Sequence, residues 1–277
     1  EDGIRDYKVT GVQTCALPIS AKVPEAAPFG YLPYIPPNNR ETELVKAARN
    51  IFCGRVSGAW VGDQDASEGD HVILVKDIRT NLMLAWLAAV VPGIRIVLLI
   101  RHPLQIVNSW MRLGWKTEAF GQRSNFDSIL EQENLLRDFP VIADAAARID
   151  PENSFQDALF QWCVCQVVPL RHLALHHASI VFYEELVLKP EITMAALAAK
   201  LDLPVDAQTE LPDWSKSSRT NYLKRDFKKS TKSDLIGSWR EYFQEEQISW
   251  AMDLLTRFGL GKLYDASGLP NDPMSLF

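Results

Sequence analysis

The chain has 277 residues, of which 47% are hydrophobic and 23% are charged, an ordinary globular composition. This balance excludes a fibrous or largely disordered protein, and the length suits one large α/β domain or two small ones. The formal net charge of −6 argues against a general binder of nucleic acids or of anionic membranes, although a local basic pocket remains compatible with it.

The first twenty residues, EDGIRDYKVTGVQTCALPIS, resemble the translation of a common sequencing-library adapter. Acidic residues near the start and the lack of an apolar core argue against a secretory signal. We therefore interpret residues 1–20 as a non-native segment that forms no part of a sheet, and residues 21–277 as the domain. On this interpretation the native N-terminus is missing.

Three segments with different patterns follow. Residues 21–39 are rich in proline, which excludes a regular helix and a central strand, so they are predicted to form a loop. Residues 40–56 carry apolar side chains at helical spacing and predict an amphipathic helix. Residues 72–75 form a short aliphatic run, which predicts a buried strand that ends in Lys76 and Asp77.

A second strand is predicted close behind the first. Residues 81–93 indicate a helix that ends at a Pro-Gly pair, and residues 96–100 are a β-branched and aliphatic run typical of a strand buried on both faces. Strand, helix and strand in about thirty residues indicate a βαβ unit, so we expect the two strands to lie parallel in one sheet. Ligands of open α/β sheets bind at the carboxyl edge, where both polar ends would then meet.

Arg101 follows the second predicted strand, and Pro103 favours the start of a helix directly after it. A guanidinium, a helix N-terminus and the Ser109 hydroxyl would together suit a phosphate, because the guanidinium offers paired donors to an anion. The alternative is that Arg101 pairs with a local carboxylate and Ser109 has no ligand role. The spacing alone does not decide between the two.

The strand, the R-H-P sequence of residues 101–103 and a serine eight residues after the arginine resemble the 3′-phosphate-binding segment of one enzyme family. This family is the sulfotransferases that use 3′-phosphoadenosine 5′-phosphosulfate (PAPS). Three more segments resemble it in the same order: the strand with its lysine at 72–77, the strand, Tyr-Glu-x-Leu turn and helix at 180–204, and the C-terminal residues 228–264.

The resemblance implies a three-layer α/β domain with a parallel sheet of P-loop NTPase-like topology, whose first strand and phosphosulfate-binding loop are missing. It implies transfer of a sulfuryl group from PAPS to a hydroxyl or amine acceptor, with a glycan among the candidates, and we expect the chain without that loop to be inactive. Two alternatives stay open, a non-catalytic nucleotide-binding module and a P-loop kinase-like enzyme. The kinase would need a G-x-x-x-x-G-K-[ST] motif, which the chain lacks.

The resemblance also assigns site residues. It places Lys76 near the reacting sulfuryl group, and Asp77 is our hypothesis for the catalytic base, because Ile78 stands where cytosolic members have a histidine. Arg101 and Ser109 match the two 3′-phosphate ligands, and Tyr183 is placed near the nucleotide. Four residues of the late loop are further candidates for the 3′-phosphate: Ser218, Arg219, Lys228 and Lys229.

Other chemistry is not indicated. The cysteines form no C-x-x-C pair and have no histidine at zinc spacing, so we expect no metal and no disulfide framework. No apolar run approaches the roughly 20 residues of a membrane span, and we expect a cytoplasmic protein with no nucleic-acid partner. Glu184 and Glu185 follow a predicted strand, where a helix cap is favoured over a catalytic role.

Overall fold

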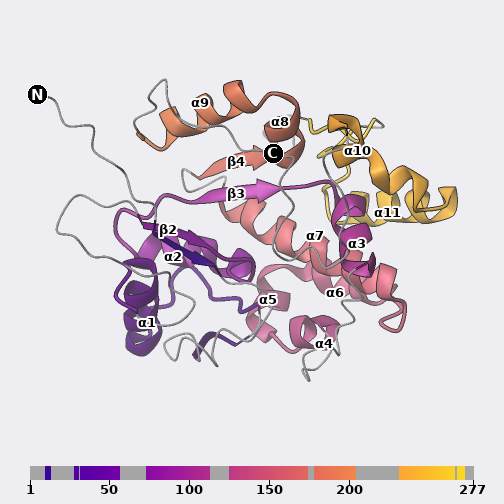
Figure 1. Ribbon diagram of the computed structural model, residues 1–277. Coiled ribbons are helices and arrows are strands. Elements are labelled where there is room, and N and C mark those ends of the chain that lie inside the picture. The colour runs from indigo at the N-terminus through magenta and orange to yellow at the C-terminus, as the bar shows by residue number, and fades with distance from the viewer. Residues whose placement is uncertain are drawn as a thin grey trace, which may run out of the picture. The chain divides into compact units, whose positions relative to one another are not determined.

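The computed structural model describes eight ranges of the chain, which form a mixed α/β structure with parallel strand pairs (Figure 1). The chain divides into two compact units, Glu1–Ile94 and Arg95–Phe277. We describe each unit by itself. The described ranges are 10–13, 28–30, 32–56, 73–112, 125–173, 178–203, 231–265 and 267–271.

The first unit confirms the helices and the strand that the sequence predicts at 40–56, 72–75 and 81–93. The last of these helices ends before Gly93, whose φ of 74° lies in the left-handed region that favours glycine. The elements of this unit are β1 (Thr10–Gln13), α1 (Thr42–Phe52), β2 (Ile73–Lys76), the 3-10 helix η3 (Asn81–Met83) and α2 (Leu84–Val90).

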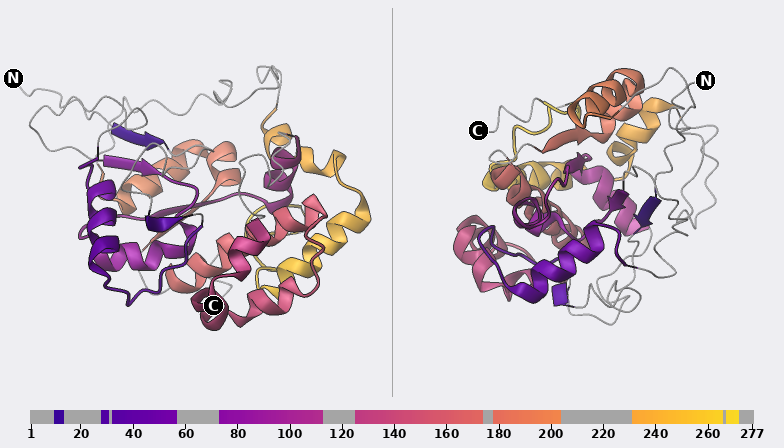
Figure 2. Two further views of the ribbon diagram at one scale, coloured as in Figure 1. Left: turned by 90° about the horizontal axis from the view of Figure 1, so that it is seen from below. Right: turned by 90° about the vertical axis from the view of Figure 1, so that its left-hand side faces the viewer.

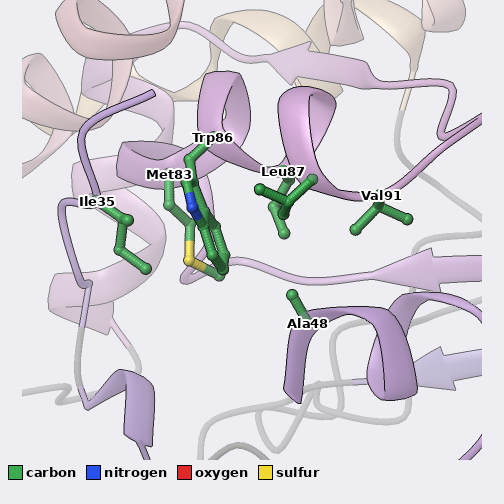
Figure 3. Close-up of a cluster of buried hydrophobic side chains, with 7 residues drawn as sticks. Ile35, Ala48, Met83, Trp86, Leu87 and Val91 are labelled. Carbon is green, nitrogen blue, oxygen red and sulfur yellow. The ribbon is translucent and has the colours of Figure 1, made fainter. Parts of the chain in front are cut away.

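A cluster of buried side chains holds α1 and α2 together (Figure 3). Trp86 of α2 is fully buried, and its indole N–H donates to the backbone carbonyl of Asn39 at 3.0 Å. Arg49 of α1 donates to the carbonyl of Val90, the last residue of α2, at 2.8 Å. The amphipathic pattern of α1 therefore has the packing role that the sequence predicts. The cluster consists of Ile35, Ala48, Met83, Trp86, Leu87, Val90 and Val91.

The prediction that residues 1–20 form no part of a sheet is wrong for four of them. β1 pairs in parallel with β2, with Thr10 opposite Ile73 and Gln13 opposite Lys76 (Figure 2). Threonine and valine in the sequence TGVQ have high β-propensity, and the edge of β2 offers unpaired backbone groups that any extended segment can use. The origin of a segment does not restrict such backbone pairing.

The second unit contains a second parallel pair, β3 (Val97–Ile100) and β4 (Ser179–Phe182), with Val97 opposite Ser179 and Ile100 opposite Phe182. Figure 1 shows the two arrows side by side, with α8 directly after β4. The helices of this unit are α3 (Pro103–Arg112), α4 (Asn125–Leu130), α5 (Glu133–Asp138), α6 (Pro140–Ala146), α7 (Ser154–Leu173), α8 (Tyr183–Leu188), α9 (Pro190–Lys200), α10 (Lys232–Gly237), the 3-10 helix η6 (Ser238–Glu241) and α11 (Glu245–Arg257).

Two details of the predicted βαβ unit are wrong. In the described residues β2 and β3 belong to separate strand pairs, because β3 takes its parallel neighbour from a segment about eighty residues further along the chain. β3 is also not buried on both faces: Leu98 and Ile100 are buried, whereas Val97 is 39% and Leu99 53% exposed. A continuous aliphatic run does not reveal which face is covered.

Helix α7 forms the centre of the second unit. Its residues 159–170 are buried, and it contacts α3, α4, α6 and α11. Among the described ranges, no helix combines the length and hydropathy that crossing a membrane requires. A helix this buried on all sides belongs to a protein core, where it can carry side chains into a site from behind.

The β1–β2 pairing can be tested by removing residues 1–20 and measuring backbone hydrogen exchange. Paired amides of a strand exchange slowly, so the shortened chain should exchange faster at Ile73–Lys76. Strand β4 belongs to the other unit and serves as the control. Unchanged exchange in β2 would show that β1 contributes no hydrogen bonds in solution.

Candidate functional site

Arg101 and Tyr183 meet at the carboxyl edge of the second parallel pair. Ile100 and Phe182 end their strands opposite each other, so the residues that follow them emerge at the same edge. The guanidinium carbon of Arg101 lies 4.1 Å from the centre of the Tyr183 ring, a cation–π contact. The structure therefore brings together two of the residues that the sequence predicts for nucleotide binding.

The peptide group between Arg101 and His102 is held on both sides. The indole N–H of Trp162, from α7, donates to the carbonyl of Arg101 at 3.2 Å. The amide of His102 donates to Oε1 of Glu184, from α8, at 2.9 Å. The second carboxylate oxygen, Oε2, accepts the hydroxyl of Tyr264 at 3.2 Å. Helices α7 and α8 thus hold this peptide group directly, and Tyr264 holds the carboxylate that accepts its N–H.

The Arg101 guanidinium keeps a spare donor. One terminal nitrogen donates to the carbonyl of Leu235 in α10 at 3.2 Å, while the buried Nε has no hydrogen-bond partner in the described part of the chain. Within the described ranges, no carboxylate forms an ion pair with Arg101. Burial lowers the pKa of Arg101, and electrostatic interactions with Tyr183, Glu184 and Tyr264 oppose this shift. The alternative of a local carboxylate partner therefore does not hold for these residues.

Glu184 is fully buried and caps a helix, as the sequence favours, but the helix is α3 rather than its own helix α8. Burial raises the pKa of the Glu184 carboxyl. Hydrogen bonds from the His102 amide and from its own amide lower that pKa, as do the Arg101 charge and the Tyr264 hydroxyl. The carboxylate lies at the N-terminus of α3, where the sequence predicted a ligand phosphate.

His102 has a structural role. Its ring stacks on Trp239 with centroids 4.4 Å apart and meets Tyr264 edge-on at 4.8 Å. Burial, and then the charges of Arg240 and Arg101, lower the pKa of His102 to about 3. The imidazole is therefore neutral at physiological pH, and it is not a base for a reaction at the strand edge.

Ser109 lies half-buried on α3, six residues after Pro103, which is roughly 9 Å along the helix axis at 1.5 Å per residue. The same helix is tied to η6, because Gln105 donates to the Ser238 hydroxyl at 3.0 Å. In the described part of the chain no hydrogen bond joins Ser109 to Arg101. Their joint role in holding one phosphate stays a prediction.

The other predicted residues belong to the first unit or lie outside the described residues. Lys76 is exposed and Asp77 half-buried after β2 in the first unit, where Asp77 Oδ1 accepts the Arg79 amide at 2.6 Å. The four late-loop candidates lie outside the described residues: Ser218, Arg219, Lys228 and Lys229.

Several residues around Arg101 were not predicted from the sequence. A buried tryptophan needs an acceptor for its indole N–H, so Trp162 carried a signal, but its position in the sequence does not say which carbonyl it reaches. Leu235, and Tyr264 that bonds Glu184, lie within residues 228–264, the segment that resembles the family, but the resemblance assigned no contact to them. Trp239 stood within a segment that resembled the family, without an assigned role.

Comparisons with known proteins add little. No family model and no curated protein matches this chain. Among solved structures, it is similar to the sulfotransferase domain from the curacin biosynthetic pathway, with 16% identity and a TM-score of 0.42. The match covers 68% of this chain and 63% of that one, so this chain spans less than two thirds of the neighbour's length. Identity and TM-score at this level carry no argument about fold or activity. No group of three potential metal ligands occurs in the described ranges.

Asp157 of α7 is a buried carboxyl outside the Arg101 site. It is 4% exposed, and no described residue donates a hydrogen bond to its Oδ1. Burial, and to a lesser degree the charge of Asp127, raise the pKa of Asp157 to about 6 from 3.8. The folded state therefore holds a proton that the unfolded chain releases, so stability falls as the pH rises from about 3.8 to 6.

Asp157→Asn should remove this dependence, because an amide carries no charge at any of these pH values. The free energy of unfolding of the variant minus that of the unaltered protein should rise as the pH goes from 3.5 to 7. The rise should reach up to about 3 kcal/mol, at 1.36 kcal/mol per pKa unit. Urea denaturation at several pH values measures this gain. A difference that stays constant with pH would contradict the raised pKa.

Proposed function

We propose that the chain is a sulfotransferase that uses PAPS, and that Arg101 holds the 3′-phosphate of the nucleotide. The observation that carries the proposal is the Arg101 guanidinium: a half-buried cation at the carboxyl edge of two parallel strands, whose buried Nε has no hydrogen-bond partner among the described residues. A buried unpaired donor on a cation is costly unless an anion satisfies it. A phosphate fits this group, because guanidinium groups bind phosphate through paired, charge-assisted hydrogen bonds.

Residues of this chain would hold the nucleotide in the following way. Arg101 and the Ser109 hydroxyl donate to the 3′-phosphate, and the Tyr183 ring supports one face of the guanidinium. The further donors that we propose for the same phosphate are Ser218, Arg219, Lys228 and Lys229. Bound PAPS supplies the sulfuryl group and the leaving phosphate, and the residues of the chain bind and orient it.

Sulfuryl transfer resembles phosphoryl transfer, in which positioning and charge stabilisation do most of the catalytic work. Lys76 would stabilise the negative charge that grows on the leaving phosphate oxygen. Asp77 would accept the proton of the acceptor hydroxyl or amine, because a carboxylate within hydrogen-bond reach can act as a general base.

The proposal includes the finer fold: a three-layer domain of P-loop NTPase-like topology in residues 21–277. The exposed side chains of Val97 and Leu99 support a further layer, because parallel strands are normally covered on both faces. We place the protein in the cytoplasm.

Arg101→Ala should weaken the binding of adenosine 3′,5′-bisphosphate at least tenfold. The lost hydrogen bonds between charged groups contribute roughly 1.5–3 kcal/mol each, and 1.4 kcal/mol already corresponds to a factor of ten. Titration followed by NMR measures the affinity of each protein for this nucleotide.

Arg95→Ala is the matched control, since Arg95 is a half-exposed arginine of the same unit that pairs with Asp202 at 3.6 Å. This variant should bind like the unaltered chain. Equal affinities for all three proteins, or no binding by the unaltered chain, would remove Arg101 as a phosphate ligand.

A further inference from the structure

We infer that Glu184 is a positioning residue, which acts through the peptide group between Arg101 and His102 and prepares the Arg101 side chain for an anion. The identity of that anion as a nucleotide phosphate rests on the proposed function. The positioning itself rests on contacts within the second unit.

The first step concerns the peptide group. Its carbonyl accepts from Trp162 at 3.2 Å and its N–H donates to Glu184 at 2.9 Å, so it is gripped from α7 on one side and from α8 on the other. A peptide group held at both polar atoms cannot rotate without breaking a hydrogen bond. The backbone from which the Arg101 side chain starts is therefore fixed.

The second step concerns the other end of the side chain. Tyr183 and Glu184 are consecutive residues at the start of α8: the tyrosine ring lies against the guanidinium, and the glutamate holds the amide that follows Arg101. The Leu235 carbonyl takes one terminal nitrogen. Arg101 is thus ordered at both ends before a ligand arrives, which reduces the entropy that binding must still remove.

The third step excludes a direct role for Glu184. Its side chain is fully buried, and its two oxygens accept from the His102 amide and the Tyr264 hydroxyl. Tyr264 is itself 5% exposed, so a ligand does not reach the carboxylate from that side. Glu184 therefore influences binding through Arg101 and not by touching the ligand.

Two substitutions at Glu184 separate the effect of side-chain length from the effect of charge. Glu184→Gln keeps the length of the side chain, and its amide oxygen can still accept the His102 amide, but the negative charge is lost. Glu184→Asp keeps the charge and shortens the side chain by one methylene, so the carboxylate is withdrawn from the His102 amide. Positioning requires that the glutamine variant behaves like the unaltered protein and the aspartate variant does not. Glu185→Gln and Glu185→Asp are matched controls at the exposed neighbour.

The readout is the ¹⁵N heteronuclear NOE of the Arg101 Nε–H in the ligand-free full chain, assigned with Arg101→Lys, together with the thermal midpoint of each variant. We expect a rigid Arg101 signal in the unaltered protein, in Glu184→Gln and in both Glu185 variants, and a mobile one in Glu184→Asp. Any other pattern, including a rigid signal in Glu184→Asp, would overturn the positioning role.

A second readout links positioning to the nucleotide. Adenosine 3′,5′-bisphosphate should bind at least fivefold more weakly to Glu184→Asp than to Glu184→Gln, and the two Glu185 variants should bind equally. If the unaltered chain binds no nucleotide, the proposed function fails, while the Nε–H signal still decides the positioning role. If nucleotide binds and the two Glu184 variants have equal affinity, the positioning role fails and the proposed function stands.

Discussion

The hydrogen bond from the His102 amide to the buried Glu184 carboxylate is the contact on which the arrangement of the site depends. It joins the start of α3 to the start of α8, and the Tyr264 hydroxyl adds the C-terminal part of the second unit to the same carboxylate. A charged carboxylate that is buried away from solvent is stable only when hydrogen-bond donors satisfy its oxygens. Each such hydrogen bond contributes roughly 1.5–3 kcal/mol. Because the donors come from distant parts of the chain, the carboxylate links the two strand ends to the C-terminal segment.

Arg101 and the Glu184 carboxylate differ in how far hydrogen bonds satisfy their polar atoms. Each oxygen of the anion accepts a hydrogen bond, whereas the adjacent cation has a buried Nε without a partner among the residues that the structure describes. Had the Glu184 carboxylate turned toward Arg101, the two charges would have formed an ion pair and left the helix N-terminus uncapped. The observed division leaves one donor-rich cation at the edge of the β3–β4 pair, and this is the chemistry that an oxyanion requires.

Local patterns made much of this predictable. The aliphatic run before Arg101, the proline at the first helical position and the run before Tyr183 predicted the two strands and α3, because these elements depend on neighbouring residues. Strand partnership was not predictable: β2 and β3 follow each other in the chain but pair with other strands. Nor did the apolar run of β3 reveal its exposed face.

Some residues of the candidate site were predictable from the sequence and others were not. Arg101 and Tyr183 were predicted to be near the nucleotide, and the strand register brings them into contact. Two partners hold Arg101: Leu235, which lies 134 residues away in the sequence, and Trp162, which lies 61 residues away. Such contacts depend on the packing of α7 and α10 against the strand ends, for which a single sequence holds no local pattern.

The most direct test of the account compares two nucleotides that differ only in the 3′-phosphate. Adenosine 3′,5′-bisphosphate and adenosine 5′-monophosphate are titrated against the unaltered chain and against Arg101→Ala under the same salt concentration. The account predicts that the bisphosphate binds at least tenfold more tightly to the unaltered chain, and that Arg101→Ala binds both nucleotides equally, since a factor of ten corresponds to 1.4 kcal/mol. The same preference for the bisphosphate in both proteins would contradict it.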